Sequence, residues 1–340
     1  MKSLTGFLLL CQAIFFVGAN VCEESWSGTC INYVYNSCLS GYSYSLSGCA
    51  FQEMCCIPPI KLPPAPPLAD GQCGVTYPET QAHASRIVGG TAAARGEFPW
   101  QVSLRAYVAG GHHMCGGILI SDKWILSAAH CFRDATSKNP FAWNGILGDY
   151  DRGDIDGHEK LVKLDTLIIH SGFNQEFGND VAMLRIATTN VSMYTRYVRP
   201  VCLPAAGESF QHMTCTVTGW GAAFNGGHGT RFLYKANIPL ISNEVCSYLL
   251  DRQISDGELC AGEKMGGIDG DSGGPMVCLR DGVWKVAGIV SWGYHCADSY
   301  SPGVYTNVSY YRSWIDTVTQ YYTDAPAKRG ADGTLGVHYL

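Results

Sequence analysis

The segment Gly270–Pro275 places a serine between glycines and an aspartate, in the order Gly-Asp-Ser-Gly-Gly-Pro. The hydroxyl of Ser272 is a weak nucleophile at neutral pH and needs a neighbouring base to attack a carbonyl carbon. The reaction also needs N–H donors directed at the oxyanion that forms, and glycine beside the serine allows this because it lacks a Cβ. A glycine-rich turn without activity could have the same sequence. The catalytic interpretation therefore requires a base, an orienting acid and a route of activation elsewhere in the chain.

Both the base and the acid have candidates. His130 follows the apolar residues 124–126, and Asp180 precedes the apolar residues 181–184. In isolation, such a histidine is more often a core residue and such an aspartate is usually a turn residue. The chain order His130, Asp180, Ser272 favours a catalytic triad instead. In that triad Asp180 would hold the imidazole in one tautomer and stabilise the imidazolium without taking the proton.

A route of activation is present in the run Arg-Ile-Val-Gly-Gly, residues 86–90. Cleavage after Arg86, in a polar and accessible stretch, would give Ile87 a new ammonium group on an apolar side chain. A buried ammonium needs a partner of opposite charge, and Asp271, beside the serine, is the obvious one. That pair would order the oxyanion loop only after cleavage.

The elements that position these residues are predicted to be mainly β-strands. Residues 98–104 lead into an alternating strand, and residues 118–120 and 124–126 are apolar. Residues 310–320 predict a terminal helix. Hydrophobic residues make up 46% of the chain, which is enough for a sizeable core. The net charge of −6, without any Lys/Arg run, argues against nucleic acid or an anionic membrane surface as a partner.

Residues 1–19 have the pattern of a secretory signal peptide, with an apolar core and small residues at the expected cleavage site. No second apolar span follows, so we expect a secreted, extracellular protein whose cysteines pair. Of the 16 cysteines, Cys11 would be removed with the signal, which leaves an odd number and indicates an unpaired thiol. Residues 22–56 are rich in cysteine and poor in aliphatic side chains, so disulfides must hold this module together. The proline-rich residues 57–86 predict an extended linker that carries the activation site.

Residues from Cys73 to about Tyr322 resemble the trypsin/chymotrypsin family, through the Ile-Val-Gly-Gly, Ala-Ala-His-Cys and Gly-Asp-Ser-Gly-Gly-Pro motifs. The resemblance implies a mostly β fold over residues 87–322, with two antiparallel six-stranded β-barrels and a C-terminal helix. We expect the tail, residues 323–340, to be disordered. The N-terminal module ends in adjacent cysteines and resembles the clip domain of invertebrate serine protease zymogens; another small disulfide knot is the alternative. The pairs that these resemblances imply are Cys22–Cys55, Cys30–Cys49, Cys38–Cys56, Cys73–Cys202, Cys115–Cys131, Cys215–Cys278 and Cys246–Cys260.

The family resemblance also implies roles in substrate binding. The N–H groups of Gly270 and Ser272 would form the oxyanion hole, and Asp269 would lie at the base of the specificity pocket and favour cleavage after Arg or Lys. An edge strand would pair with extended peptide substrate, and two glycines would keep the pocket wide; these residues are Ser291, Trp292, Gly293 and Gly303. The implied partners are protein or peptide substrates, an upstream activating protease and proteinaceous inhibitors, and no cofactor is required for the chemistry.

Two further features have open interpretations. Asp149, Asp151, Asp156 and Glu159 lie in one acidic loop, where calcium-binding trypsins place ligands. Either a structural calcium ion or a solvated acidic turn would explain them. Sequons at Asn190 and Asn307 predict N-glycosylation, although such sequons are often unoccupied.

The specificity loop departs from the family pattern. Asp269 runs directly into Gly270, whereas the family has three more residues there, including a cysteine that would have paired with Cys296. The short loop therefore explains the odd cysteine and predicts that Cys296 is a free thiol. Two functions remain open: an active trypsin-like zymogen, which the complete triad favours, and an impaired protease homologue that acts as a binding or cofactor protein, which the short loop favours.

Overall fold

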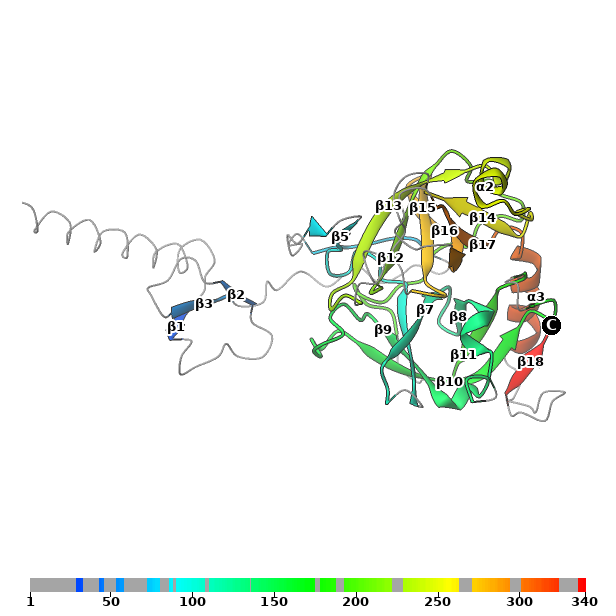
Figure 1. Ribbon diagram of the computed structural model, residues 1–340. Coiled ribbons are helices and arrows are strands. Elements are labelled where there is room, and N and C mark those ends of the chain that lie inside the picture. Colours follow the sequence, from blue (N-terminus) through cyan, green and yellow to red (C-terminus); the bar gives the residue numbers. More distant parts are fainter. Residues whose placement is uncertain are drawn as a thin grey trace, which may run out of the picture. The chain divides into compact units, whose positions relative to one another are not determined.

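A computed structural model describes residues 29–32, 43–45, 53–57, 72–79, 86–87, 90–107, 110–134, 136–174, 178–187, 193–221, 229–262, 271–293, 301–323 and 336–340. The chain divides into two compact units, Met1–Pro63 and Pro64–Leu340. In the first unit, the described residues form a small antiparallel sheet in the order β1-β3-β2 (Figure 1). Its strands are β1 (Thr29–Asn32), β2 (Ser43–Ser45) and β3 (Glu53–Ile57).

The first barrel of the second unit has six strands. They follow the order β11-β8-β7-β6-β9-β10, and a further pairing of β11 with β10 closes the barrel. All of these pairings are antiparallel. The strands are β6 (Gln101–Ala106), β7 (His113–Leu119), β8 (Trp124–Ser127), β9 (Trp143–Leu147), β10 (Lys160–Ile169) and β11 (Ala182–Ile186).

The second barrel has the same construction. Its strands follow the order β12-β15-β16-β17-β14-β13, and β12 pairs with β13 to close it. They are β12 (Thr214–Gly219), β13 (Tyr234–Ile241), β14 (Glu258–Ala261), β15 (Pro275–Arg280), β16 (Val283–Gly293) and β17 (Gly303–Asn307). Two short strands, β4 (Arg86–Ile87) and β5 (Gly90–Ala92), extend this sheet from β13. The expected architecture of two six-stranded antiparallel barrels is confirmed.

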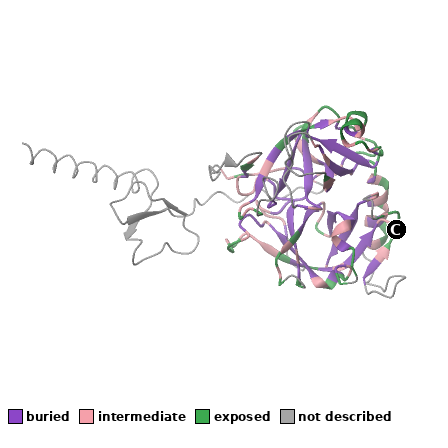
Figure 2. Cartoon of the chain, viewed as in Figure 1, coloured by how far each residue is buried: buried purple, intermediate pink, exposed green. Residues whose placement is uncertain are grey.

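Buried apolar side chains fill both barrels (Figure 2). One cluster joins the first barrel to the C-terminal helix α3 (Arg312–Tyr322), through Ile315 and Val318. Ser242 caps the helix α2 (Asn243–Leu250), because its hydroxyl accepts the N–H of Val245. Short 3₁₀ helices cover Ala129–Phe132 and Pro140–Ala142. Among the described residues, no helix is both long and apolar enough to cross a membrane.

The expectation of a disordered tail is wrong for the last five residues. Strand β18 (Val337–Tyr339) adds to the edge of the first barrel and runs parallel to β10. Val337 is fully buried, and the indole N–H of Trp314 donates to the carbonyl of Leu340 at 2.7 Å. The edge of β10 offers unpaired backbone groups and an apolar contact, which stabilise a segment that composition alone marks as unstructured.

Four disulfides join the described cysteines in the pattern that the resemblance implies: Cys73–Cys202, Cys115–Cys131, Cys215–Cys278 and Cys246–Cys260. The expected disulfides of the N-terminal module and the signal peptide rest on residues or side chains outside the described part of the chain. Four other predicted features also lie outside the described residues: Asp269, Gly270, Cys296 and the sequon at Asn190.

Candidate active site

His130 and Asp180 form a closely coupled pair. The imidazole Nδ1 lies 2.7 Å from one carboxylate oxygen of Asp180, and the backbone N–H of His130 donates to the other at 2.8 Å. His130 belongs to the 3₁₀ turn that follows β8, while Asp180 lies two residues before the start of β11, the neighbouring strand of the barrel. The strand pairing therefore brings two residues together that lie 50 positions apart. This geometry leaves Nε2 of the imidazole as the nitrogen that can act on a nucleophile.

Asp180 is almost completely buried and is held from the second barrel. Ser291, in β16, donates its hydroxyl to the carboxylate at 2.5 Å, and Thr306, in β17, donates to the Asp180 carbonyl at 2.7 Å. The preceding residue, Asn179, has a φ of 54°. These bonds fix the carboxylate in the position from which it orients the imidazole of His130.

Ser272 is anchored to the first barrel. Its carbonyl oxygen accepts the N–H of Gly116, in β7, at 2.8 Å. The next residue, Gly273, has a φ of 84°, and a Cβ there would overlap the hydroxyl of Ser127. Glycine is thus required directly after the serine, because the chain turns sharply against the base of β7 and β8. The candidate nucleophile and the histidine are both fixed to the same pair of strands.

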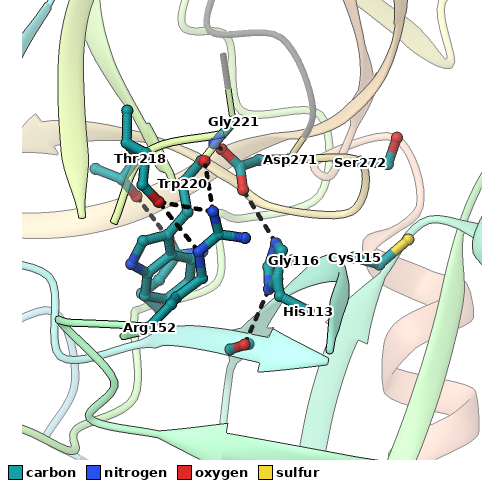
Figure 3. A network of polar contacts seen from close by, with 12 residues as sticks. His113, Cys115, Gly116, Arg152, Thr218, Trp220, Gly221, Asp271 and Ser272 are labelled. Carbon is teal, nitrogen blue, oxygen red and sulfur yellow. Dashed lines mark hydrogen bonds and ion pairs between the residues drawn. The ribbon is translucent and has the colours of Figure 1, made fainter. Parts of the chain in front are cut away.

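Asp271 points away from the candidate nucleophile, into a polar network between the barrels (Figure 3). One carboxylate oxygen lies 3.4 Å from Nε2 of His113, and the other accepts the N–H of Gly221 at 2.6 Å. The His113 Nδ1 atom in turn lies 2.9 Å from the hydroxyl of Ser103. Both the aspartate and the histidine side chains are nearly inaccessible, with 1% and 6% of their surface exposed. We call this arrangement the Asp271 latch.

The comparisons with known proteins agree with this geometry. Residues 87–315 match the family model described as Trypsin, which covers both barrels and all three candidate catalytic residues. The chain belongs to the trypsin family. It is also 39% identical, over 243 residues, to coagulation factor XI of Bos taurus. That alignment covers 69% of this chain but 38% of the relative, so the chain spans little more than a third of that protein's length.

The residues that the resemblance predicts for substrate binding lie in strands β16 and β17. Gly293, at the end of β16, lies opposite Gly303, the first residue of β17. The ring of Trp292 lies under the guanidinium of Arg252, whose central carbon is 4.2 Å from the ring centroid. The indole N–H of Trp292 donates to Glu258 at 3.3 Å, and Glu258 lies 3.4 Å from Arg252. This strand therefore has a cationic group beside the tryptophan that the sequence did not predict.

The acidic loop does not gather its carboxylates around a common point. Asp149 binds Arg105 at 2.6 Å, Asp151 binds Arg231 through two bonds of 2.7 Å, and Asp156 pairs with Arg95. Glu159 accepts the backbone N–H groups of residues 156 and 157. Burial raises the pKa of Asp149, whereas for Asp151 the bonds from Arg231 and a backbone N–H outweigh burial and lower the pKa. No group of three or more metal-binding side chains occurs among the described residues.

Arginine side chains bind the carboxylate oxygens of Asp149, Asp151 and Asp156, which calcium would need as ligands. The four carboxylates therefore do not fit a calcium ion in this arrangement. The sequence also failed to indicate the members of the Asp271 latch. His113, Ser103 and Gly221 come from three separate strands or turns, and no spacing in the chain links them. The register of β6 with β7 sets Arg105 opposite His113, and this pairing brings His113 close to Ser103.

Proposed function

We propose that this chain is a secreted serine endopeptidase zymogen that is activated by cleavage after Arg86 and then cleaves peptide bonds after Arg or Lys. The observation that carries the proposal is the Asp271 latch beside a formed His130–Asp180 pair. The candidate base, His130, is paired with Asp180, while Asp271, next to the nucleophile, contacts His113 and Gly221. This combination is the one expected of a protease precursor in which activation, not the triad, is incomplete.

Catalysis would begin with the Ser272 hydroxyl losing its proton to Nε2 of His130 as the oxygen attacks the peptide carbonyl. Asp180 would stabilise the imidazolium, and Ser291 would keep the carboxylate in place. The imidazolium would then protonate the leaving amine. Water would then attack the acyl-enzyme and lose its proton to Nε2 of His130. The imidazolium would return a proton to the Ser272 oxygen as the acyl group leaves.

Activation would move Asp271 from His113 to the new ammonium group of Ile87. The chain is continuous through β4, where Arg86 and Ile87 pair with β5. An ion pair with the new N-terminus would change the conformation of the segment beside Asp271. The N–H groups of Gly270 and Ser272 would then point at the oxyanion. We propose that the latch is the inactive alternative of this switch.

Substrate selection would rest on Asp269, whose carboxylate would bind a P1 Arg or Lys through charge-assisted hydrogen bonds. Residues 291–293 would pair with the substrate backbone. The substrates and inhibitors are expected to be extracellular proteins, and an upstream protease would cut after Arg86. The Cys73–Cys202 disulfide would keep the N-terminal module attached after that cut.

The second candidate function is an impaired homologue that binds without cleaving, and the short loop before Gly270 favours it. One donor of the oxyanion hole contributes about 10²–10³ in kcat, so a displaced Gly270 would leave little activity. Three proteins distinguish the two functions: the chain as it stands, Ser272→Ala, and a form with Ala-Cys-Gln inserted between Asp269 and Gly270.

Each protein is cut after Arg86 and titrated with an active-site reagent and an Arg-containing peptide substrate. An active protease gives hydrolysis in the unaltered chain that Ser272→Ala abolishes. Activity in the inserted form alone would support the impaired homologue, and no activity in either form would refute the zymogen proposal. On a gel, the cut chains must separate only with reductant.

A further inference from the structure

The C-terminal strand β18 binds the first barrel beside the turn that leads to the triad aspartate. It runs parallel to the end of β10 (Figure 1). The N–H of Leu167 donates to the carbonyl of Gly336 at 2.7 Å, and the N–H of Leu340 donates to the carbonyl of Ile169 at 3.1 Å. The side chain of Val337, between these two bonds, is fully buried. Backbone pairing and one buried side chain therefore hold the strand in a fixed register on β10.

The end of β18 also makes two bonds beyond β10. The carbonyl of Leu340 accepts the backbone N–H of Ser171 at 2.9 Å and the indole N–H of Trp314, in α3, at 2.7 Å. Ser171 is the second residue after β10, and the ring of Trp314 lies 5.4 Å from that of His170, the first. One carbonyl of the tail thus joins the C-terminal helix to the turn that begins at His170.

This turn in turn contacts both neighbours of Asp180 in the chain. The carbonyl of Gly172 accepts a side-chain N–H of Asn179 at 2.9 Å. The backbone N–H of His170 donates to the carbonyl of Val181 at 3.2 Å. The turn after β10 therefore lies directly between the tail strand and the segment that carries the triad aspartate.

Asn179 determines the direction in which the chain enters Asp180. Its φ of 54° is uncommon for a residue with a side chain, although asparagine adopts it more readily than most. Both ends of its amide are held: Nδ2 donates to Gly172, and Oδ1 accepts the hydroxyl of Tyr311 at 3.1 Å. Tyr311 itself packs edge-on against His170 at 5.3 Å. A turn that lost its bond to the tail would hold Asn179 less firmly.

We infer that β18 is a positioning element for the triad: it holds the turn after β10, which holds Asn179 and so fixes Asp180 against His130. Its effect on hydrolysis rests on the proposed function, whereas its effect on the His130–Asp180 pair does not. Ser291 and Thr306 support Asp180 independently from the second barrel, so the loss of β18 should weaken the arrangement without abolishing it. We expect kcat to fall about three- to tenfold. KM should change less than about twofold, because the altered contacts do not bind the substrate.

The main test is Val337→Asp in the full chain. A carboxylate at this buried position should release β18 without changing a residue of the barrel. The matched control is Tyr339→Ser, which alters an exposed side chain of the same strand and should change nothing. Each protein is cut after Arg86, and kcat per titrated active site and KM are measured on an Arg-containing peptide. Titration removes any contribution from unfolded protein.

Two further measurements separate positioning from general stability. A synthetic Gly-Val-His-Tyr-Leu peptide, the sequence of residues 336–340, should restore kcat in Val337→Asp, and Gly-Asp-His-Tyr-Leu should not. Asn179→Gly removes the amide but retains a backbone that tolerates positive φ. If β18 acts through Asn179, Val337→Asp should lower kcat much less in this background than in the unaltered chain. Equal reductions in the two backgrounds would overturn the route through Asn179.

The last readout does not depend on activity. NMR on the uncleaved Ser272→Ala protein follows the exchange with water of the proton on Nδ1 of His130. We expect Val337→Asp to speed this exchange, the restoring peptide to slow it again, and Tyr339→Ser to leave it unchanged. An exchange rate that Val337→Asp does not alter would overturn the inference, as would an unchanged kcat in an active protein. If the exchange changes as expected but no form hydrolyses peptides, the proposed function fails and the positioning role stands.

Discussion

Replacing His113 by alanine should destabilise the uncleaved protein much more than the cleaved one. Neither His113 Nε2 nor the Asp271 oxygen that faces it has a hydrogen-bond partner among the described residues; the two atoms lie 3.4 Å apart, and the Asp271 side chain is 1% exposed. Loss of the facing imidazole would leave this buried carboxylate oxygen without a polar neighbour, which costs about 1–3 kcal/mol. We therefore expect a loss of about 2 kcal/mol in the uncleaved form. For a domain of this size that corresponds to a fall in Tm of about 4–8 °C.

The cleaved form should lose far less, because Asp271 would then pair with the ammonium group of Ile87. Both forms share the other contacts of His113, which are the bond to Ser103 and the edge-on packing against Trp220 at 5.3 Å. The informative quantity is thus the difference between the two Tm shifts, measured by calorimetry on Ser272→Ala protein before and after cleavage. That comparison removes the packing contribution common to both forms.

A matched control is available in His170→Ala. His170 packs edge-on against Tyr311 at 5.3 Å and near Trp314 at 5.4 Å, remote in sequence from the latch. Its removal should lower Tm equally in both forms. An equal fall for His113→Ala in the cleaved and uncleaved proteins would show that the histidine only packs, and the latch interpretation would be wrong.

Three further predictions concern other parts of the fold. Gly219→Ala should lower the Tm of the uncleaved form selectively, because a Cβ there would overlap the latched carboxylate of Asp271; an unchanged Tm would contradict the latch position. Val337→Ala should cost about 1–2 kcal/mol through lost apolar burial, seen as a lower denaturant midpoint, and an unaffected midpoint would mean that β18 does not contribute to stability. Burial and a hydrogen bond to Glu79 raise the pKa of Tyr197 to about 12, above its usual value near 10, so the stability that this group contributes is present below pH 10 and lost toward pH 12. Tyr197→Phe should flatten the fall of stability between about pH 10 and 12, and an unchanged slope would refute the assignment.

The sequence predicts the barrels and the close approach of His130 to Asp180 because those features follow from local motifs. Strand alternation, paired cysteines and the motifs around His130 and Ser272 are each readable within a few residues. The Asp271 latch depends on strand register, which one stretch of sequence does not determine. The carboxylates of the acidic loop are compatible by type with either calcium ligands or a solvated turn, whereas in the fold distant arginines, such as Arg231, bind them.

The C-terminal tail shows that composition alone does not predict whether a segment is ordered. Residues 323–340 are small and polar on average, and that average hides Val337, which finds a buried site on the edge of β10. Composition predicts whether a segment can form a core by itself. It does not predict whether an existing sheet edge can bind that segment.

The contacts that hold the candidate base bear on the short specificity loop. Among the described residues, the bonds to Asp180 come from His130, Ser291 and Thr306. We therefore expect a shortened loop to displace Gly270 more than it disturbs the His130–Asp180 pair. An impaired homologue would still ionise Ser272, yet it would stabilise the tetrahedral intermediate poorly. Such a protein would react with an active-site phosphonate more slowly than its repaired form, but faster than a variant without the histidine, and that ordering distinguishes a damaged oxyanion hole from a lost triad.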